Sequence, residues 1–426
     1  MADEQIIVKP PQPEPKLNYA NGRLLMPENR YWPSQLWASP WALATYRRGA
    51  VVLAAIVTGA AAAAWIIGEL SARVDPLYNF AESFALSYGI GAEWIAGVWT
   101  LIKAAILLAV PLVNTLFAVW WERKISAHIQ SRLGPMYTGG WHGWLQTVAD
   151  GLKLFLKEDI VPDCADPKIH LLAPAVVIVP AIVAFAPIPF GKDLIFANVD
   201  IGTLYVFAVA GVSVMGIIMA GWASGNKFSL LGGLRSAAQL VSYELPRTFS
   251  IIPVIMLAGT LNLAGIADCQ AGYWGGFIPR WFVFYPVVGQ LAFLLFLTAS
   301  VAETNRVPFD IPEAESELVA GYNTEYAGMK FALFFLSEFA YVLLASCLMA
   351  AFFFGGGAAP LEFLNILPGW AWFLAKVLVL MFSFLWFRWT FPRFRVDQLM
   401  DFNWKFLVPV SLFNIAAAGL MIWLIS

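Results

Sequence analysis

Residues 303 to 330 read ETNRVPFDIPEAESELVAGYNTEYAGMK and lie between two long apolar runs, at 281–302 and 330–354. In this acidic loop, six carboxylates stand against two cations, Arg306 and Lys330. The carboxylates are Glu303, Asp310, Glu313, Glu315, Glu317 and Glu325. Acidic residues contribute little to membrane orientation, so a topology signal does not explain them. The pattern predicts a connection between two membrane spans that has a function of its own.

Composition sets the class of protein. Hydrophobic residues make up 60% of the chain and charged residues 13%, whereas a soluble domain has roughly 25% charged residues. The 19 tryptophans suit a protein with aromatic belts at both membrane surfaces. The composition therefore excludes an ordinary soluble domain and indicates a polytopic membrane protein.

Nine apolar runs are near or above the length of about 20 residues that crosses a hydrocarbon core of about 30 Å. They lie at 49–70, 99–121, 171–190, 201–223, 245–265, 281–302, 330–354, 368–387 and 404–425. Each run is continuously apolar and lacks the alternating pattern of a membrane strand. We therefore predict an all-α, polytopic membrane helix bundle with about nine transmembrane helices.

The distribution of Lys and Arg predicts the orientation of these spans. One set of connections, which includes the acidic loop, holds fifteen of them, and the opposite set holds only Arg73, Lys192 and Arg280. The richer side is expected in the cytoplasm. The chain is therefore expected to be a multi-pass membrane protein with a cytoplasmic N-terminus and a cytoplasmic acidic loop.

The N-terminal region differs from the remainder. Its first apolar run begins only after 48 residues, and the segment KPPQPEP at 9–15 is too rich in proline and charge to form a core. We divide the chain into a cytoplasmic, partly flexible tail (1–48), an extra transmembrane helix (49–70), an outside loop (71–98) and a membrane domain (99–426).

Cysteines and histidines are few and poorly placed for a redox centre. The three cysteines and the three histidines are Cys164, Cys269, Cys347, His128, His142 and His170. The cysteines fall in an inside loop, an outside loop and a span, and the histidines lie in or beside one inside loop, so neither a thiolate cluster nor a paired-imidazole haem site is expected.

An amphipathic helix is predicted between the second and third spans. Its apolar positions recur at helical spacing, and its polar positions fill the other face. The apolar set is Trp141, Trp144, Leu145, Val148, Leu152, Phe155 and Leu156, and the polar set is Gln146, Asp150, Lys153 and Lys157. Such a helix lies flat at the membrane surface, either as a plain anchor or as a doorway for a lipid-like molecule.

Three ionisable residues within or at the edge of predicted spans are candidates for function, because burial of a charge there is costly. Glu244 is near the expected cytoplasmic end of its span and could form a local ion pair with Arg247 beside the kink of Pro246. Glu338 lies deeper and favours a proton or charge path. Lys376 either belongs to such a path or extends outward to the surface.

The carboxylates of the acidic loop also allow two interpretations. Pro312 fits the first position of a short helix whose first turns hold Glu313, Glu315 and Glu317, where the helix dipole favours negative charge. Clustered carboxylates can exchange protons near neutral pH. The alternative is a solvated acidic face that docks a basic partner.

Four blocks of sequence resemble the family of the H subunit (also called subunit 1) of respiratory complex I, NADH:quinone oxidoreductase. They are WWERKISAHIQSRLGP (120–135), ADGLKLFLKEDIVP (149–162), AGWASGNKFSLLGGLRSAAQLVSYE (220–244) and ETNRVPFDIPEAESELVAGYNTEY (303–326). The resemblance covers about residues 95–426. It leaves the first 95 residues, with the run at 49–70, as an addition. It also breaks at Met136 and Tyr137, where many relatives have Asn and commonly Arg.

The resemblance implies eight core spans at the heel of a membrane arm and a chamber in which quinone approaches an iron–sulfur cluster of a neighbouring soluble subunit. No cofactor is expected on this chain, quinone is the substrate, and NADH, FMN and iron–sulfur clusters belong to partner subunits. The expected partners are those soluble subunits, small membrane-arm subunits and lipids, with no nucleic acid.

The same resemblance supplies most of the candidate site residues. At the quinone chamber it implies Glu122, Arg123, Arg132, Asp150, Lys153, Arg235, Arg306 and Asp310, to which we add Trp144 of the amphipathic helix. On a charged path toward the antiporter-like subunits it implies Glu244, Glu313, Glu315, Glu317, Glu325 and Glu338, to which we add Lys376.

Two other functions remain open from sequence. A membrane-bound hydrogenase has a related membrane anchor subunit that binds no quinone. A proton-coupled secondary transporter belongs to a different class, and it predicts paired broken helices in two halves of the chain. No such pairing is visible in this sequence.

Overall fold

The computed structural model of the 426-residue chain describes residues 19–20, 23–24, 92–191, 194–274, 278–311, 319–365 and 367–425. The chain divides into two units, residues 1–67 and 68–426. In the first unit, strands β1 (Tyr19–Ala20) and β2 (Arg23–Leu24) pair antiparallel. The predicted extra helix at 49–70, the other residues of the predicted tail and most of the predicted loop at 71–98 lie outside the described residues.

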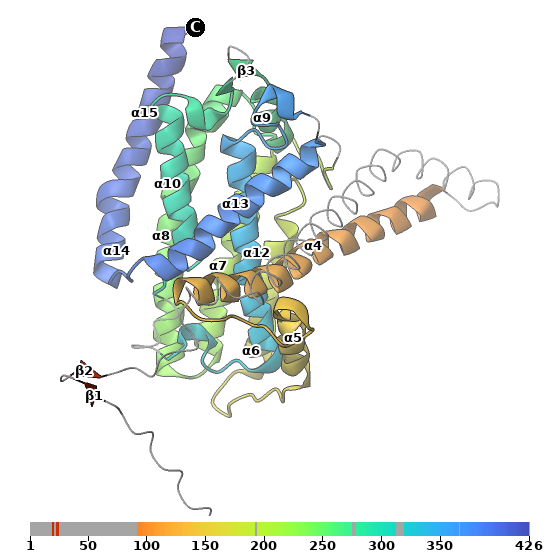
Figure 1. Cartoon of the computed structure of the whole chain (residues 1–426), viewed down its shortest axis with the longest axis vertical. Helices are drawn as coiled ribbons and strands as arrows, with labels where there is room; N and C mark the ends of the chain where they lie inside the picture. The colour runs from red at the N-terminus through yellow and green to blue at the C-terminus, as the bar shows by residue number, and fades with distance from the viewer. Residues whose placement is uncertain are drawn as a thin grey trace, which may run out of the picture. The chain divides into compact units, whose positions relative to one another are not determined.

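The second unit is a helix bundle, and its long helices match the eight predicted spans of the family core (Figure 1). They are α4 (Ala92–Ile129), α6 (Pro167–Val183), α7 (Gly202–Ala223), α8 (Lys227–Ala258), α10 (Val288–Glu303), α12 (Gly328–Phe353), α13 (Gly369–Thr390) and a last helix made of α14 (Val396–Phe402), the π-helix η5 (Asn403–Leu407) and α15 (Val408–Ile425). Within the described residues, six of these are long and apolar enough to span a membrane, while α6 and α10 are apolar but shorter. The chain is therefore a multi-pass helical membrane protein.

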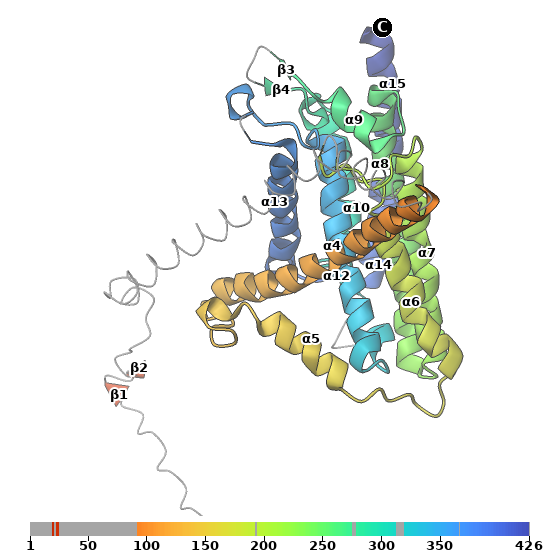
Figure 2. The same ribbon diagram turned by 90° about the vertical axis from the view of Figure 1, so that its right-hand side faces the viewer.

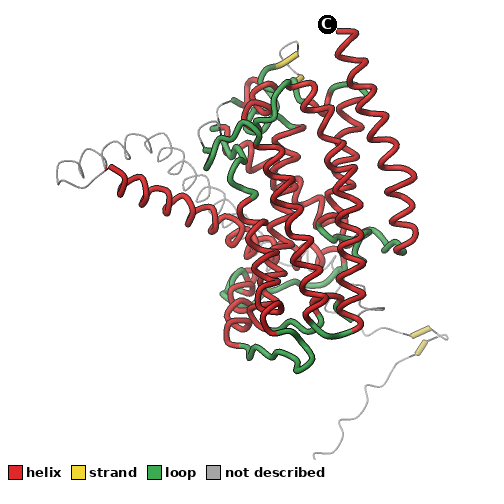
Figure 3. Tube along the Cα trace, turned by 180° about the vertical axis from the view of Figure 1, so that it is seen from behind, coloured by secondary structure: helices red, strands yellow, loops and turns green. Residues whose placement is uncertain are grey.

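The two ends of this bundle carry different short elements (Figure 3). At one end lie the amphipathic helix α5 (Gln146–Leu156) and the 3-10 helices η1 (Trp141–Gly143) and η3 (Gly321–Asn323). At the other lie α9 (Leu263–Cys269), strands β3 (Tyr273–Trp274) and β4 (Ile278–Pro279), and the 3-10 helices η2 (Phe282–Phe284) and η4 (Glu362–Leu364). We refer to them as the α5 end and the β3–β4 end (Figure 1).

Helix α8 begins well before the predicted span at 245–265. Its first turn is capped by Asn226, whose side chain accepts a hydrogen bond from the backbone N–H of Phe228. Along 227–244 the helix buries a face of mostly small residues, such as Gly232, Ser236 and Ala237, through a segment that we expected to be a loop. The predicted start of this helix was therefore wrong, because Glu244 is in the middle of a 32-residue helix.

Helix α12 is the most buried of the six long helices. In its most apolar window 67% of residues are buried, compared with 22% for α4 and for the last helix. It packs against α4, α6, α10 and α13, while α8 packs against α7, α10 and α15. Both views of the bundle show α4 crossing the other long helices obliquely (Figures 1 and 2). The core is therefore built around α12 and α8, and α4 lies at its side.

The predicted amphipathic helix exists, but it starts later than expected. Trp144 and Leu145 precede α5 instead of opening it, and Trp141 belongs to η1. The apolar side chains of Trp144, Leu152 and Phe155 are exposed. Because this face is not covered by the described protein, it is available to lipid or to a lipid-like molecule. Its position at the membrane surface stays a prediction.

Candidate functional site

A small cavity lies among α6, α7, α8, α10, α12 and the residues around η3. Its volume is about 30 Å³, which is room for about two water molecules. Three carboxylates line it, Glu244 of α8, Glu303 of α10 and Glu338 of α12, together with Asn305, Tyr322 and Tyr341. We call this site the carboxylate cavity. It brings together Glu244 and Glu338, which sequence analysis assigned separately to a charge path.

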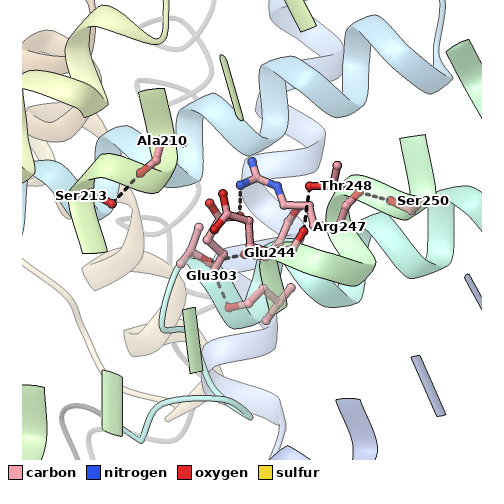
Figure 4. Close-up of polar contacts among 10 residues, drawn as sticks. Ala210, Ser213, Glu244, Arg247, Thr248, Ser250 and Glu303 are labelled. Atoms are coloured by element: carbon pink, nitrogen blue, oxygen red, sulfur yellow. Dashed lines mark hydrogen bonds and ion pairs between the residues drawn. The ribbon is translucent and has the colours of Figure 1, made fainter. Parts of the chain in front are cut away.

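One cationic side chain, that of Arg247 of α8, lies beside this cavity. Its guanidinium forms an ion pair and hydrogen bond with Glu303 (Figure 4). It is only 1% exposed and lies 5.0 Å from the ring centre of Phe207 and 5.4 Å from that of Phe296. The sequence suggested Glu244 as the partner of Arg247, but the ion pair is with Glu303. Within the described chain, the cavity therefore has three carboxylates and a single paired arginine.

Glu244 and Glu338 have different surroundings in the cavity. Glu244 lies against α7, where a Cβ atom added to Gly211 would be only 2.9 Å from Glu244 Oε1. The hydroxyl of Tyr322 donates to Glu338 Oε1 at 3.4 Å. Tyr322 belongs to η3, at the end of the acidic loop. The loop therefore contacts the deep carboxylate directly.

A second charged site lies where α4 meets the segment that follows α10. The Glu122 carboxylate accepts from Arg306 at 3.1 Å and from Arg388 at 2.7 Å. Arg306 is 2% exposed, and its guanidinium lies 4.6 Å from the ring centre of Phe339. Nearby in the chain, Asp310 pairs with Arg393 at 2.8 Å. We call Glu122, Arg306, Arg388, Asp310 and Arg393 the arginine node.

Part of the arginine node is left without partners inside the described chain. The Nε and Nη2 atoms of Arg306 and the Oδ1 atom of Asp310 are buried and make no hydrogen bond to any described group. Buried polar atoms are normally hydrogen-bonded. These atoms therefore point to a partner that is outside the described residues, such as water, substrate or another chain.

The other residues predicted at the chamber lie around α4, α5 and α8. Arg123 of α4 pairs with Asp150 of α5 at 2.6 Å. Arg132, Lys153 and Trp144 are exposed, and Arg235 is half-buried on α8. Asp150 and Lys153 belong to α5 and Trp144 precedes it, whereas Glu122, Arg306 and Asp310 lie in the arginine node. The nine predicted chamber residues therefore fall into separate groups.

His142 and Tyr326 lie outside the spans and have altered acidity. Burial lowers the pKa of His142 in η1, and the positive charges of Lys124 and His128 lower it further. Burial raises the pKa of the Tyr326 phenol, at the end of the acidic loop. His142 therefore favours its neutral form, and Tyr326 keeps its proton in the physiological range.

Several residues predicted on the charge path do not line the cavity. Glu325 accepts a hydrogen bond from Asn226 Nδ2 at 2.7 Å. Lys376 donates to the carbonyls of residues 354, 356 and 358 at 2.6, 2.8 and 2.6 Å, in the connection that follows α12. Glu313, Glu315 and Glu317, with the short helix predicted from Pro312, lie outside the described residues. Their roles, and that of Lys376, stay predictions.

Sequence reasoning missed several members of both sites. Arg388 and Arg393 were counted only as positive charges of a cytoplasmic connection, although they pair with Glu122 and Asp310. Tyr341 follows Glu338 by three positions, so helical spacing could have placed both on one face. Within the described residues, no group of three or more His, Cys, Asp or Glu side chains is placed to hold a metal ion.

Comparison with known proteins assigns the family. A family model described as NADH dehydrogenase matches residues 102–419. The chain belongs to this family. It is 44% identical over 340 residues to a protein of Geobacillus kaustophilus that is named as the H subunit of NADH-quinone oxidoreductase, and the match covers 80% of this chain and 95% of that protein.

Two further relatives carry the same name. This chain is 47% identical over 315 residues to the protein of Anoxybacillus flavithermus, with 74% of this chain and 91% of that protein covered. It is 46% identical over 318 residues to the protein of Bacillus cytotoxicus, with 75% and 92% covered. Membership of the NADH dehydrogenase family confirms the resemblance seen in the four sequence blocks.

Proposed function

We propose that this chain is a membrane subunit of NADH:quinone oxidoreductase that forms part of the quinone chamber and the start of a charged path for coupling. One observation carries the proposal: the segment 303–310 contributes to both sites. Its first residue, Glu303, lines the carboxylate cavity, while Arg306 and Asp310 belong to the arginine node. Because only a few residues separate the two sites along this segment, a change in charge at the node alters the electrostatic potential at the cavity.

The arginine node suits the polar end of the chamber. Arginine stays charged at any physiological pH, and the unpaired donors of Arg306 can bind a developing negative charge. The exposed apolar face beside Trp144 and Leu152 suits entry of a quinone from lipid. Residues Arg123, Arg132, Asp150, Lys153 and Arg235 would border this route.

The carboxylate cavity suits proton exchange. Three carboxylates line a space with room for water, and Glu303 is paired with Arg247, so one of the carboxylates can take up a proton while the ion pair is kept. The contact of Tyr322 with Glu338 connects the cavity to the acidic loop, whose Glu313, Glu315 and Glu317 would extend the path.

The remaining assignments follow from this function. Quinone is the substrate, while NADH, FMN and iron–sulfur clusters belong to partner subunits. The partners are soluble subunits around the terminal cluster, small membrane-arm subunits and lipids. The membrane is the bacterial inner membrane, with a cytoplasmic N-terminus, an added span at 49–70 and the family domain from about residue 99. Neither a hydrogenase anchor nor a secondary transporter is favoured by any contact described above.

Replacement of Arg306 by Lys tests the proposal. Lysine keeps one charge but loses the planar fork that reaches Glu122 over Phe339, so quinone reduction by the assembled complex is expected to fall by about tenfold or more. Electron transfer from NADH to an artificial acceptor upstream of quinone should stay at the wild-type rate.

The matched control is Arg280→Lys, which changes an exposed arginine after β4 at the far end of the bundle. It is expected to leave both activities unchanged. Wild-type quinone reduction in Arg306→Lys would contradict the proposed chamber.

A further inference from the structure

A trio of charged and polar groups lies at the α5 end, outside the two sites described above; Lys330 and His170 are buried, and Asp159 is exposed. Lys330, in the first turn of α12, is 2.8 Å from Asp159 Oδ2 and 3.3 Å from His170 Nδ1. Asp159 follows the C-terminus of α5, and His170 lies in the first turn of α6. Three elements are therefore joined through one ammonium group. Figure 2 shows these ends of α5, α6 and α12 at the same end of the bundle.

The protonation state of His170 follows from its partner. The Lys330 ammonium can only donate, so His170 Nδ1 must accept and carry no proton. His170 is fully buried, and its ring stacks on Tyr326 with centroids 4.1 Å apart and planes 2° apart. The trio is therefore complete only while the imidazole is neutral.

Backbone packing supports the same junction. Gly328, which opens α12, has φ +55°, and a Cβ atom there would lie 3.2 Å from the carbonyl oxygen of Lys157 and 3.5 Å from that of Leu154. The last turn of α5 therefore lies directly against the start of α12, and the Asp159–Lys330 ion pair is beside this contact. Glu338 is two helical turns further along α12, at the carboxylate cavity.

The charged groups that face His170 come from three parts of the chain. Lys330 belongs to α12 and Asp159 to the connection after α5, while Glu325 and the Tyr326 phenol come from the end of the acidic loop. Helix α7, which packs along α6, contains no Asp, Glu, Lys, Arg or His. The Glu325 carboxylate is itself bound by Asn226.

We propose that Asp159, Lys330 and His170 form a latch that holds the C-terminal end of α5 against α12, and that the latch opens when His170 takes up a proton. These are positioning residues, because they act through α5 and α12 and touch neither cavity nor node. The inference rests on the proposed function, since α5 carries the apolar face assigned to quinone entry and α12 carries Glu338.

The physical reason for opening is the repulsion between two positive charges. A protonated His170 would place an N–H where Nδ1 now accepts, 3.3 Å from the Lys330 ammonium. The ammonium must then move toward Asp159 and solvent, since the Asp159 side chain is 48% exposed. Loss of the shared contact frees the end of α5. The apolar face of α5 is then less well positioned for quinone entry, and the KM for quinone rises.

Amide hydrogen exchange in the intact complex tests the latch itself. Lys330→Met removes the ion pair and the donor, so the amides of 154–159 should exchange about threefold faster, the scale of losing one half-exposed ion pair. Lys330→Arg, which keeps the charge, should stay near wild type. Asp163→Asn changes an exposed aspartate of the same connection and should have no effect.

Quinone kinetics test how the latch is used. The Lys330 ammonium disfavours a charged imidazole, so His170 takes up a proton only below the ordinary histidine pKa of about 6.5. In wild type, the KM for quinone should therefore be about threefold higher at about pH 5 than at about pH 8. His170→Gln can still accept from Lys330 but cannot become charged, so the rise at low pH should disappear. In Lys330→Met, the KM should be raised at both pH values with little change in kcat.

The outcomes separate the latch from the function on which it rests. Unchanged exchange at 154–159 in Lys330→Met overturns the latch. Faster exchange with an unaltered KM, or a His170→Gln enzyme that keeps the full pH dependence, overturns its role in quinone entry. If Arg306→Lys also leaves quinone reduction intact, the proposed function itself has failed, whatever exchange shows.

Discussion

Carboxylates outnumber arginines at the carboxylate cavity, whereas arginines outnumber carboxylates at the arginine node. The cavity has three carboxylates and one arginine around space for water. In the node, the Glu122 carboxylate is shared by two arginines, and Asp310 pairs with a third. A carboxylate can lose its charge by taking a proton, whereas an arginine cannot lose its charge in a protein. The cavity can therefore change its protonation, and the node keeps a fixed positive charge.

Glu122→Gln is expected to have the largest effect, because it leaves Arg306 buried and unpaired. Removal of one partner from a buried ion pair costs about 3–5 kcal/mol. Arg306 cannot neutralise itself, and only 2% of its side chain is exposed. The complex should assemble poorly and unfold at a lower temperature, as measured by the yield and thermal midpoint of the purified membrane arm.

Asp401→Asn is the control for Glu122→Gln. It breaks the ion pair of Lys405 with Asp401 at 2.6 Å, in which both side chains are largely exposed. Exposed pairs contribute little, so assembly and thermal midpoint should not change. Equal effects of the two variants would contradict the buried, fixed charge assigned to the node.

Arg247→Met should cost less stability than Glu122→Gln, although Arg247 is as buried as Arg306. Its removal leaves Glu303, which can take up a proton from the water of the cavity and become neutral. We expect a loss of about 1–3 kcal/mol, the cost of a buried group without its hydrogen bond. Quinone-linked turnover should fall, because the cavity has lost its only arginine among the described residues.

Adding Glu303→Gln to Arg247→Met sharpens this comparison. Without Arg247, the Glu303 carboxylate must take up a proton to become neutral, whereas the amide introduced by Glu303→Gln is already neutral. The double variant should therefore be no less stable than Arg247→Met alone. The thermal midpoints of the two single variants and the double variant, compared with wild type, give the coupling free energy between Arg247 and Glu303. A double variant much less stable than either single variant would show that the pair does not act as one unit.

Gly211→Ala should have the smallest effect on stability. The added methyl group would meet Glu244 Oε1 at 2.9 Å, and the end of this flexible side chain can move. The expected loss is below about 1 kcal/mol, but the displaced carboxylate should reduce quinone-linked turnover. The control is Gly151→Ala on α5, where an added Cβ would meet nothing within 4 Å. Equal quinone-linked turnover in Gly211→Ala and Gly151→Ala would show that Glu244 takes no part in the mechanism.

Sequence predicted the helices because continuous apolar runs dominate this chain. It placed α7 within a residue of its observed limits, since that run is bounded by polar residues on both sides. It missed the first half of α8, where Lys227, Arg235 and Ser242 interrupt the apolar pattern while the helix still buries one face. Hydropathy reports how apolar a segment is, whereas a capped amphipathic helix depends on spacing.

The candidate site was predicted residue by residue but not as an arrangement. Glu244 and Glu338 were identified because isolated carboxylates in apolar runs are unusual, and the structure brings them to one cavity. Their partners come from distant segments, such as Arg388 for Glu122 and Glu303 for Arg247. Such pairings depend on helix packing, which one sequence without an alignment does not contain. Lys376 looked similar to the carboxylates in sequence, but it binds three backbone carbonyls.

Proton pumping by reconstituted vesicles tests most directly whether the carboxylate cavity couples quinone reduction to proton movement. The variants are Glu244→Gln and Glu338→Gln, which keep shape and remove the titrating group. Glu362→Gln is the control, an exposed glutamate of η4 at the β3–β4 end. Each cavity variant should pump fewer protons per electron pair, while NADH oxidation by an upstream acceptor and pumping by Glu362→Gln stay at wild-type values. Wild-type pumping and quinone turnover in both cavity variants would contradict the account.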